Sequence, residues 1–204
     1  MHIVLTRHGQ VEGIDPPRFR GRMELDLTDV GRQQAQALGL AIARQFQADA
    51  VFTSPMKRCR DTGAAIAQAC SVTQQVLPGI DDFDYGDWQW MTHADANTQY
   101  PREFALWKRS PQWMCFPGGE SLQKVAWRSV EALRGLWDEH RDGTVVLVAH
   151  DSVNRVLLMH ALELPLSAYW RIEQEPCCIN ELFVGDDGVV KVMRMNDTTH
   201  LRMK

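Results

Sequence analysis

An arginine, a histidine and a glycine stand together near the start of the chain, directly after an apolar run. Arg7, His8 and Gly9 follow residues 3–5, which are Ile, Val and Leu. The planar arginine fork matches phosphate or carboxylate oxygens, and a neutral imidazole offers a lone pair that can attack an electrophile or bind a metal. Glycine lets another backbone come close. Because such a short string also occurs by chance, its meaning depends on partners elsewhere in the chain.

Two more strand-like segments end at residues of the same chemical kind. Residues 50–53 are followed by Ser54 and then by Arg58 in the first turn of a predicted helix, and residues 144–149 lead directly into His150. In α/β folds the carboxyl ends of parallel strands meet at one edge of the sheet, where ligands bind. The sequence therefore predicts that Arg7, His8, Arg58 and His150 lie close together.

The elements that position these residues alternate between strands and helices. Thr28 is expected to cap one helix, Ser54 with Pro55 to open a second, and Ser121 to cap a third. Residues 178–195 are typical of a hairpin with its turn at residues 186–188. The pattern predicts an α/β fold, a three-layer α/β/α sandwich with a mostly parallel central sheet, in one domain over residues 1–204.

A stretch at about residues 79–120 departs from this alternation. It carries several prolines and four of the seven tryptophans without sustained periodicity; the four are Trp88, Trp90, Trp107 and Trp113. We interpret it as an inserted lid, whose tryptophans mainly pack against one another and favour a substrate with an apolar face. A purely structural role is expected for the histidines outside the strand ends, His2, His93, His140, His160 and His200.

Composition narrows the classes of partner. The net charge of -4 and the pI near 6.0 provide no overall field that attracts nucleic acid or an anionic membrane. The start of the chain resembles no signal peptide, and no apolar run reaches the roughly 18 residues of a membrane span. Five cysteines without metal-ligand spacing indicate free thiols and a cytoplasmic location. The sequence makes no prediction of oligomeric state.

Six short blocks follow one another along nearly the whole chain, at residues 6–9 (TRHG), 27–35, 54–62 (SPMKRCRDT), 117–121 (PGGES), 148–155 and 196–201. In this order they resemble the histidine phosphatase superfamily, which includes cofactor-dependent phosphoglycerate mutases, α-ribazole phosphatases and related phosphatases. One block would be weak evidence, whereas six blocks in order are specific.

The resemblance implies roles for particular residues. His8 would be the nucleophile that forms a phosphohistidine, while Arg7, Arg58 and His150 hold the phosphoryl oxygens. This agrees with elementary chemistry, since phosphoryl transfer mainly needs an in-line nucleophile and fixed positive charge around the oxygens. The proton donor of the family is usually a glutamate, but that position here is Asp82, with Asp81 as the competing candidate. Further candidates for substrate contact are Arg20, Gly21, Glu120 and Asp151.

Four functions fit these residues to different degrees. The favoured one is a phosphomonoesterase that hydrolyses a small phosphorylated metabolite without metal or cofactor. A phosphoglycerate mutase-type transfer is less favoured, because such mutases carry an asparagine soon after the first block and residues 11–15 contain none. A metallophosphoesterase that uses His8, His150 and Asp151 as ligands is disfavoured, because two arginines beside the site would repel the metal ion. A non-catalytic phosphate-binding protein would bind without turnover.

Overall fold

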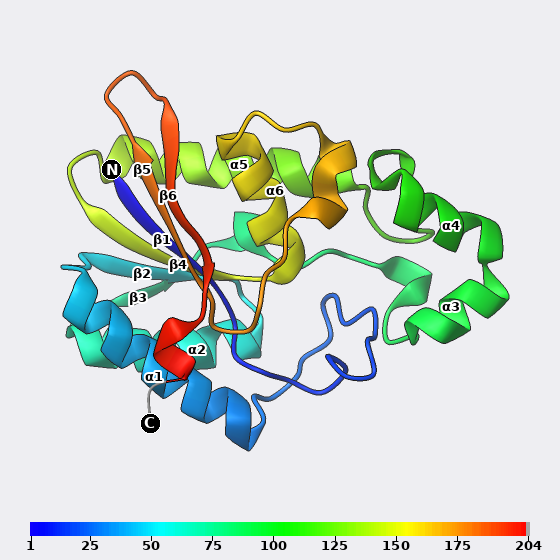
Figure 1. Cartoon of the computed structure of the whole chain (residues 1–204), viewed down its shortest axis with the longest axis horizontal. Coiled ribbons are helices and arrows are strands. Elements are labelled where there is room, and N and C mark those ends of the chain that lie inside the picture. The colour runs from blue at the N-terminus through cyan, green and yellow to red at the C-terminus, as the bar shows by residue number, and fades with distance from the viewer. Residues whose placement is uncertain (203–204) are drawn as a thin grey trace.

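A computed structural model describes residues 1–202 of the protein. A sheet of six strands runs through its middle in the order β3-β2-β4-β1-β5-β6 (Figure 1). The strands are β1 (His2–Arg7), β2 (Ala50–Thr53), β3 (Gln74–Val76), β4 (Thr144–Ala149), β5 (Ile179–Val184) and β6 (Val190–Asp197). The pairs among β1 to β4 are parallel, whereas β5 and β6 run antiparallel at one edge. The predicted mostly parallel sheet is confirmed.

Helices cover both faces of the sheet, which confirms the predicted three-layer sandwich. The helices α1 (Asp29–Gln45) and α2 (Lys57–Cys70) lie on one face, and α5 (Leu122–Glu139) and α6 (Asp151–Ala161) lie on the other (Figure 1). As expected, Thr28 and Ser121 cap their helices, since each side chain accepts a hydrogen bond from a backbone N–H in the first turn. None of the helices in residues 1–202 is long and apolar enough to cross a membrane.

The central strands are apolar on both faces because both faces are covered. In β4, Val145 and Leu147 pack under α5 and α6, while Val146 and Val148 pack under α1 and α2. All four side chains are at most 1% exposed. Burial of each such side chain contributes about 1.5–3 kcal/mol relative to an exposed position. The sheet and the two helix layers packed on it hold the strand ends, and with them the candidate site, in place.

The loop after β1 depends on two glycines that bring it against α1. A Cβ at Gly9 would lie 2.5 Å from the carbonyl oxygen of Gly31, and a Cβ at Gly31 would lie 2.1 Å from the carbonyl oxygen of Gln10. Neither contact is tolerable for a larger residue, since the neighbouring atoms are backbone. The two glycines therefore fix the approach of His8 to the first helix.

The inserted stretch contains two short helices that the sequence did not indicate, α3 (His93–Gln99) and α4 (Pro101–Arg109). They lie beyond the carboxyl ends of the parallel strands, beside the rest of the sandwich (Figure 1). Trp88 and Trp107 are buried in this part of the core, whereas Trp113 is 73% exposed. Whether residues 79–120 act as a lid stays a prediction.

One local prediction was wrong, and one strand was not predicted. Ser54 does not cap α2, because the helix begins at Lys57 and its N-cap is Met56; the Ser54 hydroxyl faces His150 instead. The short edge strand β3 was also missed, since it consists of two glutamines and a valine that are mostly solvent-facing. The five cysteines are free thiols, as expected.

Candidate active site

The strand ends bring two histidines together. His8 follows β1 and His150 follows β4, and their backbones are joined because the His8 N–H donates to the carbonyl of Ala149 at 3.0 Å. The two rings meet edge to face with their centroids 5.3 Å apart, and each residue is 1% exposed. The predicted convergence of His8 and His150 at one sheet edge is what the structure displays.

His8 is held in a form suited to nucleophilic attack. Its Nδ1 lies 2.7 Å from the carbonyl oxygen of Gly9, an acceptor that needs the Nδ1–H proton. Burial lowers the pKa of His8 well below 6.5, and the positive charges of Arg58 and Arg7, with His150 nearby, lower it further. At neutral pH the ring is therefore uncharged, with its lone pair on Nε2.

Two arginines beside the histidines have donor groups that the protein leaves unused. One Nη of Arg7 donates to the carbonyl of Gln174 at 2.6 Å, and the Nη atoms of Arg58 donate to the carbonyls of Met23 and Gly21 at 2.7 and 2.6 Å. Among the residues that the structure describes, the buried Nε atoms of both arginines have no hydrogen-bond partner. Because buried donors are normally satisfied, these positions are suited to the oxygens of a bound oxyanion.

The carboxylate of Asp82 sits at the centre of this group. Its Oδ2 lies 2.8 Å from an Nη of Arg58 and 3.3 Å from Nδ1 of His150, and its Oδ1 accepts a hydrogen bond from the Ser152 hydroxyl at 2.8 Å. The Asp82 carboxylate thus neutralises part of the positive charge of Arg58.

Asp81, the competing candidate for the proton donor, has a different environment. Its Oδ2 lies 3.3 Å from Nε of Arg22, and its Oδ1 accepts a hydrogen bond from the Ser54 hydroxyl at 3.3 Å. Burial raises its pKa. Asp81 lines neither of the chambers described below, whereas Asp82 does. The geometry therefore favours Asp82 as the acid that can reach a substrate.

His150 is supported from behind by polar and sulfur atoms. Its Nε2 lies 2.7 Å from the Ser54 hydroxyl oxygen, and Sγ of Cys59 packs 3.5 Å from the same nitrogen. Burial, together with Arg58 and other arginines, lowers the pKa of His150 well below 6.5. Ser54, Cys59 and Asp82 together hold the ring in one orientation.

Two connected chambers open at His8 and Asp82 and at Arg7, whereas Arg58 and His150 line neither of them. The smaller has a volume of about 30 Å³ and is lined by His8, Arg18, Arg20, Gly21, Asp82, Tyr85, Asp151 and Ser152. The larger has a volume of about 290 Å³ and continues from Arg18, Arg20, Tyr85 and Asp151 to an aromatic wall of Phe19, His93, Trp107, Tyr169 and Trp170. The smaller chamber ends at His8, and the larger one extends from it toward the aromatic wall.

The structure separates the remaining candidates for substrate contact. Arg20, Gly21 and Asp151 line the chambers, but Glu120 does not. The Glu120 carboxylate is 2% exposed and binds Arg128 at 2.7 Å and the backbone N–H of Asp84 at 3.0 Å. Arg128 in turn donates to the carbonyls of Gly79, Asp81 and Asp82. Glu120 therefore supports the Asp82 loop, and a contact between Glu120 and substrate stays a prediction.

Several residues of the site were not singled out from the sequence. Ser152 binds Asp82, and His93, for which the sequence predicts only a structural role, lines the larger chamber. Burial and the nearby Lys108 and Arg20 lower the pKa of His93 to about 4. The sequence could have indicated Ser152 as a site residue, because it lies two residues after His150 at the start of a helix. His93 carried none, because its place depends on the packing of the insertion.

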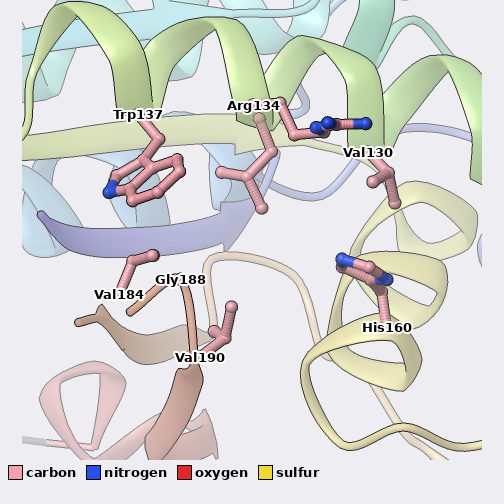
Figure 2. A pocket seen from close by; sticks show the side chains of 8 residues that line it. Val130, Arg134, Trp137, His160, Val184, Gly188 and Val190 are labelled. Carbon is pink, nitrogen blue, oxygen red and sulfur yellow. The ribbon is translucent and has the colours of Figure 1, made fainter. Parts of the chain in front are cut away.

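A third hollow lies apart from the two chambers. Its volume is about 260 Å³, and it lies between α5, the end of α6 and the β5–β6 hairpin, where Trp137, His160 and Val190 surround it (Figure 2). It shares no lining residue with the two chambers around His8 and Arg20. Within residues 1–202, no group of three or more His, Cys, Asp or Glu side chains is arranged to hold a metal ion.

Comparison with known proteins identifies the family. The model of the histidine phosphatase superfamily (branch 1) matches residues 3–198. The chain belongs to this superfamily. Among its relatives, phosphoserine phosphatase 1 of Hydrogenobacter thermophilus is 29% identical over 98% of this chain and 93% of that protein. The metal-independent phosphoserine phosphatase of Arabidopsis thaliana is 30% identical over 77% of this chain and 67% of that protein.

Solved structures of the superfamily have the same fold. Bacillus stearothermophilus YhfR superposes with a TM-score of 0.92, covers 98% of this chain and 99% of its own, and is 25% identical. The fold predicted from the resemblance is thereby confirmed. Membership in the superfamily, together with the phosphatase names of the two relatives, supports phosphatase activity for this histidine phosphatase.

Proposed function

We propose that the protein is a metal-independent phosphomonoesterase that hydrolyses a small phosphorylated metabolite through a phosphohistidine on His8. The observation that carries this proposal is the state of His8. A neutral imidazole, bound through Nδ1 to the Gly9 carbonyl, presents Nε2 beside two arginines with unused donors. Such a pairing combines a nucleophile with the fixed charge that phosphoryl transfer requires.

In the first step, Arg7 and Arg58 hold the phosphoryl oxygens while Nε2 of His8 attacks phosphorus. The phosphorus–nitrogen bond forms as the bond between phosphorus and the ester oxygen breaks. Asp82 takes up a proton from solvent once the phosphoryl group has displaced its carboxylate from Arg58, and it gives this proton to the leaving oxygen, so that an alcohol departs. His150, held by Ser54 at 2.7 Å, adds a further donor for the phosphoryl oxygens once the phosphate displaces Asp82 from it.

In the second step, water replaces the alcohol. The Asp82 carboxylate takes a proton from the water as its oxygen attacks phosphorus, and the phosphorus–nitrogen bond breaks. Inorganic phosphate leaves and His8 returns to its neutral form. The relatives named as phosphoserine phosphatases support this hydrolytic outcome over a mutase, and the name of the Arabidopsis relative supports independence from metal.

The test is phosphate release from p-nitrophenyl phosphate and a panel of phosphorylated metabolites, measured with and without EDTA. His8→Ala should abolish turnover yet still bind vanadate in calorimetry, because Arg7 and Arg58 remain. His160→Ala, at an exposed position outside both chambers, is the matched control and should keep its activity.

Three outcomes would contradict the proposal. The first is an active His8→Ala variant. The second is a loss of turnover in EDTA that zinc or manganese restores. The third is transfer of the phosphoryl group back to product without release of phosphate, which would indicate a mutase.

A further inference from the structure

Two arginines at the junction of the chambers have no acidic partner. Within residues 1–202, neither Arg18 nor Arg20 has a carboxylate within 4.0 Å. One Nη of Arg18 donates to the carbonyl of Trp90 at 2.8 Å, and one Nη of Arg20 donates to the carbonyl of Gly13 at 2.5 Å. Arg22, in the same loop, binds Asp81 and two further acids instead.

Arg20 in particular is a partly buried cation with spare donors. Its Nε atom is buried and has no hydrogen-bond partner within residues 1–202. Burial and the neighbouring Arg7 lower the pKa of Arg20 to about 10, so that the guanidinium stays charged at neutral pH. A buried charge without a partner is costly, and the cost is removed when an anion binds. Since Arg20 lines both chambers, that anion belongs to the bound molecule.

The acids in the chambers are engaged by other groups. Asp151 binds Nε of Arg155 at 2.9 Å, Glu173 binds another nitrogen of Arg155 at 3.3 Å, and Asp82 binds Arg58. Glu175 lies on the wall formed by residues 173–176 and forms no ion pair with any residue in the range 1–202. One wall of the larger chamber is thus neutralised or acidic, whereas the wall of Arg18 and Arg20 carries net positive charge.

We infer that Arg18 and Arg20 bind a carboxylate on the alcohol part of the substrate, so that the preferred substrates are phosphate esters of hydroxy acids. The inference rests on the proposed function, which places the phosphoryl group at His8 with Arg7 and Arg58. The second anion must then be close to the ester oxygen, because Arg20 lines the small chamber as well as the large one. A flat monoanion fits there with less repulsion than a second phosphate dianion, and it matches the guanidinium fork.

The experiment compares esters that differ in the carboxylate alone. One pair is 3-phosphoglycerate and glycerol 3-phosphate, and the other is phosphoserine and phosphoethanolamine. In each pair we expect kcat/KM of the intact protein to favour the carboxylated ester by about tenfold or more, as charge-assisted hydrogen bonds provide. Fructose 1,6-bisphosphate and fructose 6-phosphate form a third pair, in which no comparable preference is expected.

Arginine variants identify the groups that cause the preference. Arg20→Met and, as a second independent variant, Arg18→Met should reduce the ratio of kcat/KM within the first two pairs toward one. Arg22→Met removes the same charge from the same loop but from a side chain that its acids hold outside both chambers, and it should leave the ratio unchanged. Thermal unfolding confirms that each variant is folded.

The inference is overturned if the carboxylated esters are not favoured, if only the bisphosphate is favoured, or if the preference survives in both Arg20→Met and Arg18→Met. Hydrolysis of p-nitrophenyl phosphate without any carboxylate preference would overturn this inference alone. No phosphate release from any ester, p-nitrophenyl phosphate included, would overturn the proposed function.

Discussion

The hydroxyl of Ser152 donates a hydrogen bond to Oδ1 of Asp82 at 2.8 Å. Ser152 stands in the first turn of α6, and Asp82 comes from the loop at the start of the insertion, so this bond joins two distant parts of the chain. Both residues are at most 7% exposed. Arg58 holds the other carboxylate oxygen at 2.8 Å. Ser152 and Arg58 together are thereby placed to orient the Asp82 carboxylate.

Loss of this hydroxyl should affect proton donation more than binding. In Ser152→Ala we expect kcat for an alkyl phosphate to fall about tenfold, which corresponds to one hydrogen bond to a charged group. The value of kcat for p-nitrophenyl phosphate should change little, because that leaving group departs without a proton. Ser152→Thr, which keeps a hydroxyl, should recover part of the loss. Ser129→Ala, a buried serine on α5 that bonds to the Gly79 carbonyl, is the control, and an equal fall for both esters would refute the assignment.

Replacement of the acid itself should show the same selectivity in stronger form. Asp82→Asn keeps the size of the side chain but removes the proton that a poor leaving group needs, so we expect kcat for alkyl phosphates to fall about 100-fold or more. Asp81→Asn should lower the rates on alkyl and aryl phosphates to a similar, smaller extent, because Asp81 faces Ser54 and Arg22. Steady-state kinetics on the two ester classes decide between them. If Asp81→Asn lowered the rate on alkyl phosphates alone, Asp81 and not Asp82 would be the proton donor.

Stability should depend on pH through the buried neutral histidines. The pKa values of His8 and His150 in the folded protein lie well below 6.5, whereas in the unfolded chain they return to about 6.5. Below pH 6.5 the unfolded state therefore binds more protons, so the free energy of unfolding is highest above pH 6.5 and falls as the pH falls. Each histidine contributes at most about 1.4 kcal/mol per pH unit.

Urea unfolding between pH 7.5 and 5 measures this slope. His8→Gln removes one titrating group and should flatten the dependence of the unfolding free energy on pH. His160→Gln, at an exposed position, should leave the slope as it is. A slope in His8→Gln equal to that of the unaltered protein would mean that His8 is not a buried neutral histidine.

The main elements of the site could be predicted because they lie at strand ends. Arg7, His8 and His150 follow apolar runs whose burial on both faces leaves little freedom for the sheet, and parallel strands bring their carboxyl ends to one edge. The direction of the Ser54 side chain was not predictable in this way. Its sequence context favours a helix cap, and only the position of His150, directly after the neighbouring strand β4, turns the hydroxyl to a different partner.

The chamber for the alcohol could not be read from the sequence. Its wall combines Arg20 from the first long loop, Trp107 from the insertion and Trp170 from a short 3-10 helix at Leu166–Arg171, residues that periodicity does not relate to one another. Glu120 shows the same limit, because its motif suggested the site while its partner Arg128, two turns further along, engages it in the support of the Asp82 loop. The wall of the chamber and the role of Glu120 both depend on which side chains meet in the folded protein, and the sequence does not show this.

The central claim is a covalent bond between phosphorus and His8. Rapid mixing of the protein with a phosphate ester, followed by an alkaline quench and mass spectrometry of the intact chain and its peptides, tests it most directly. We predict one added phosphoryl group, located on the peptide that contains His8, formed within the first turnover and absent in His8→Ala. Turnover at full rate without any phosphorylated protein, or a phosphoryl group on another residue, would contradict the account.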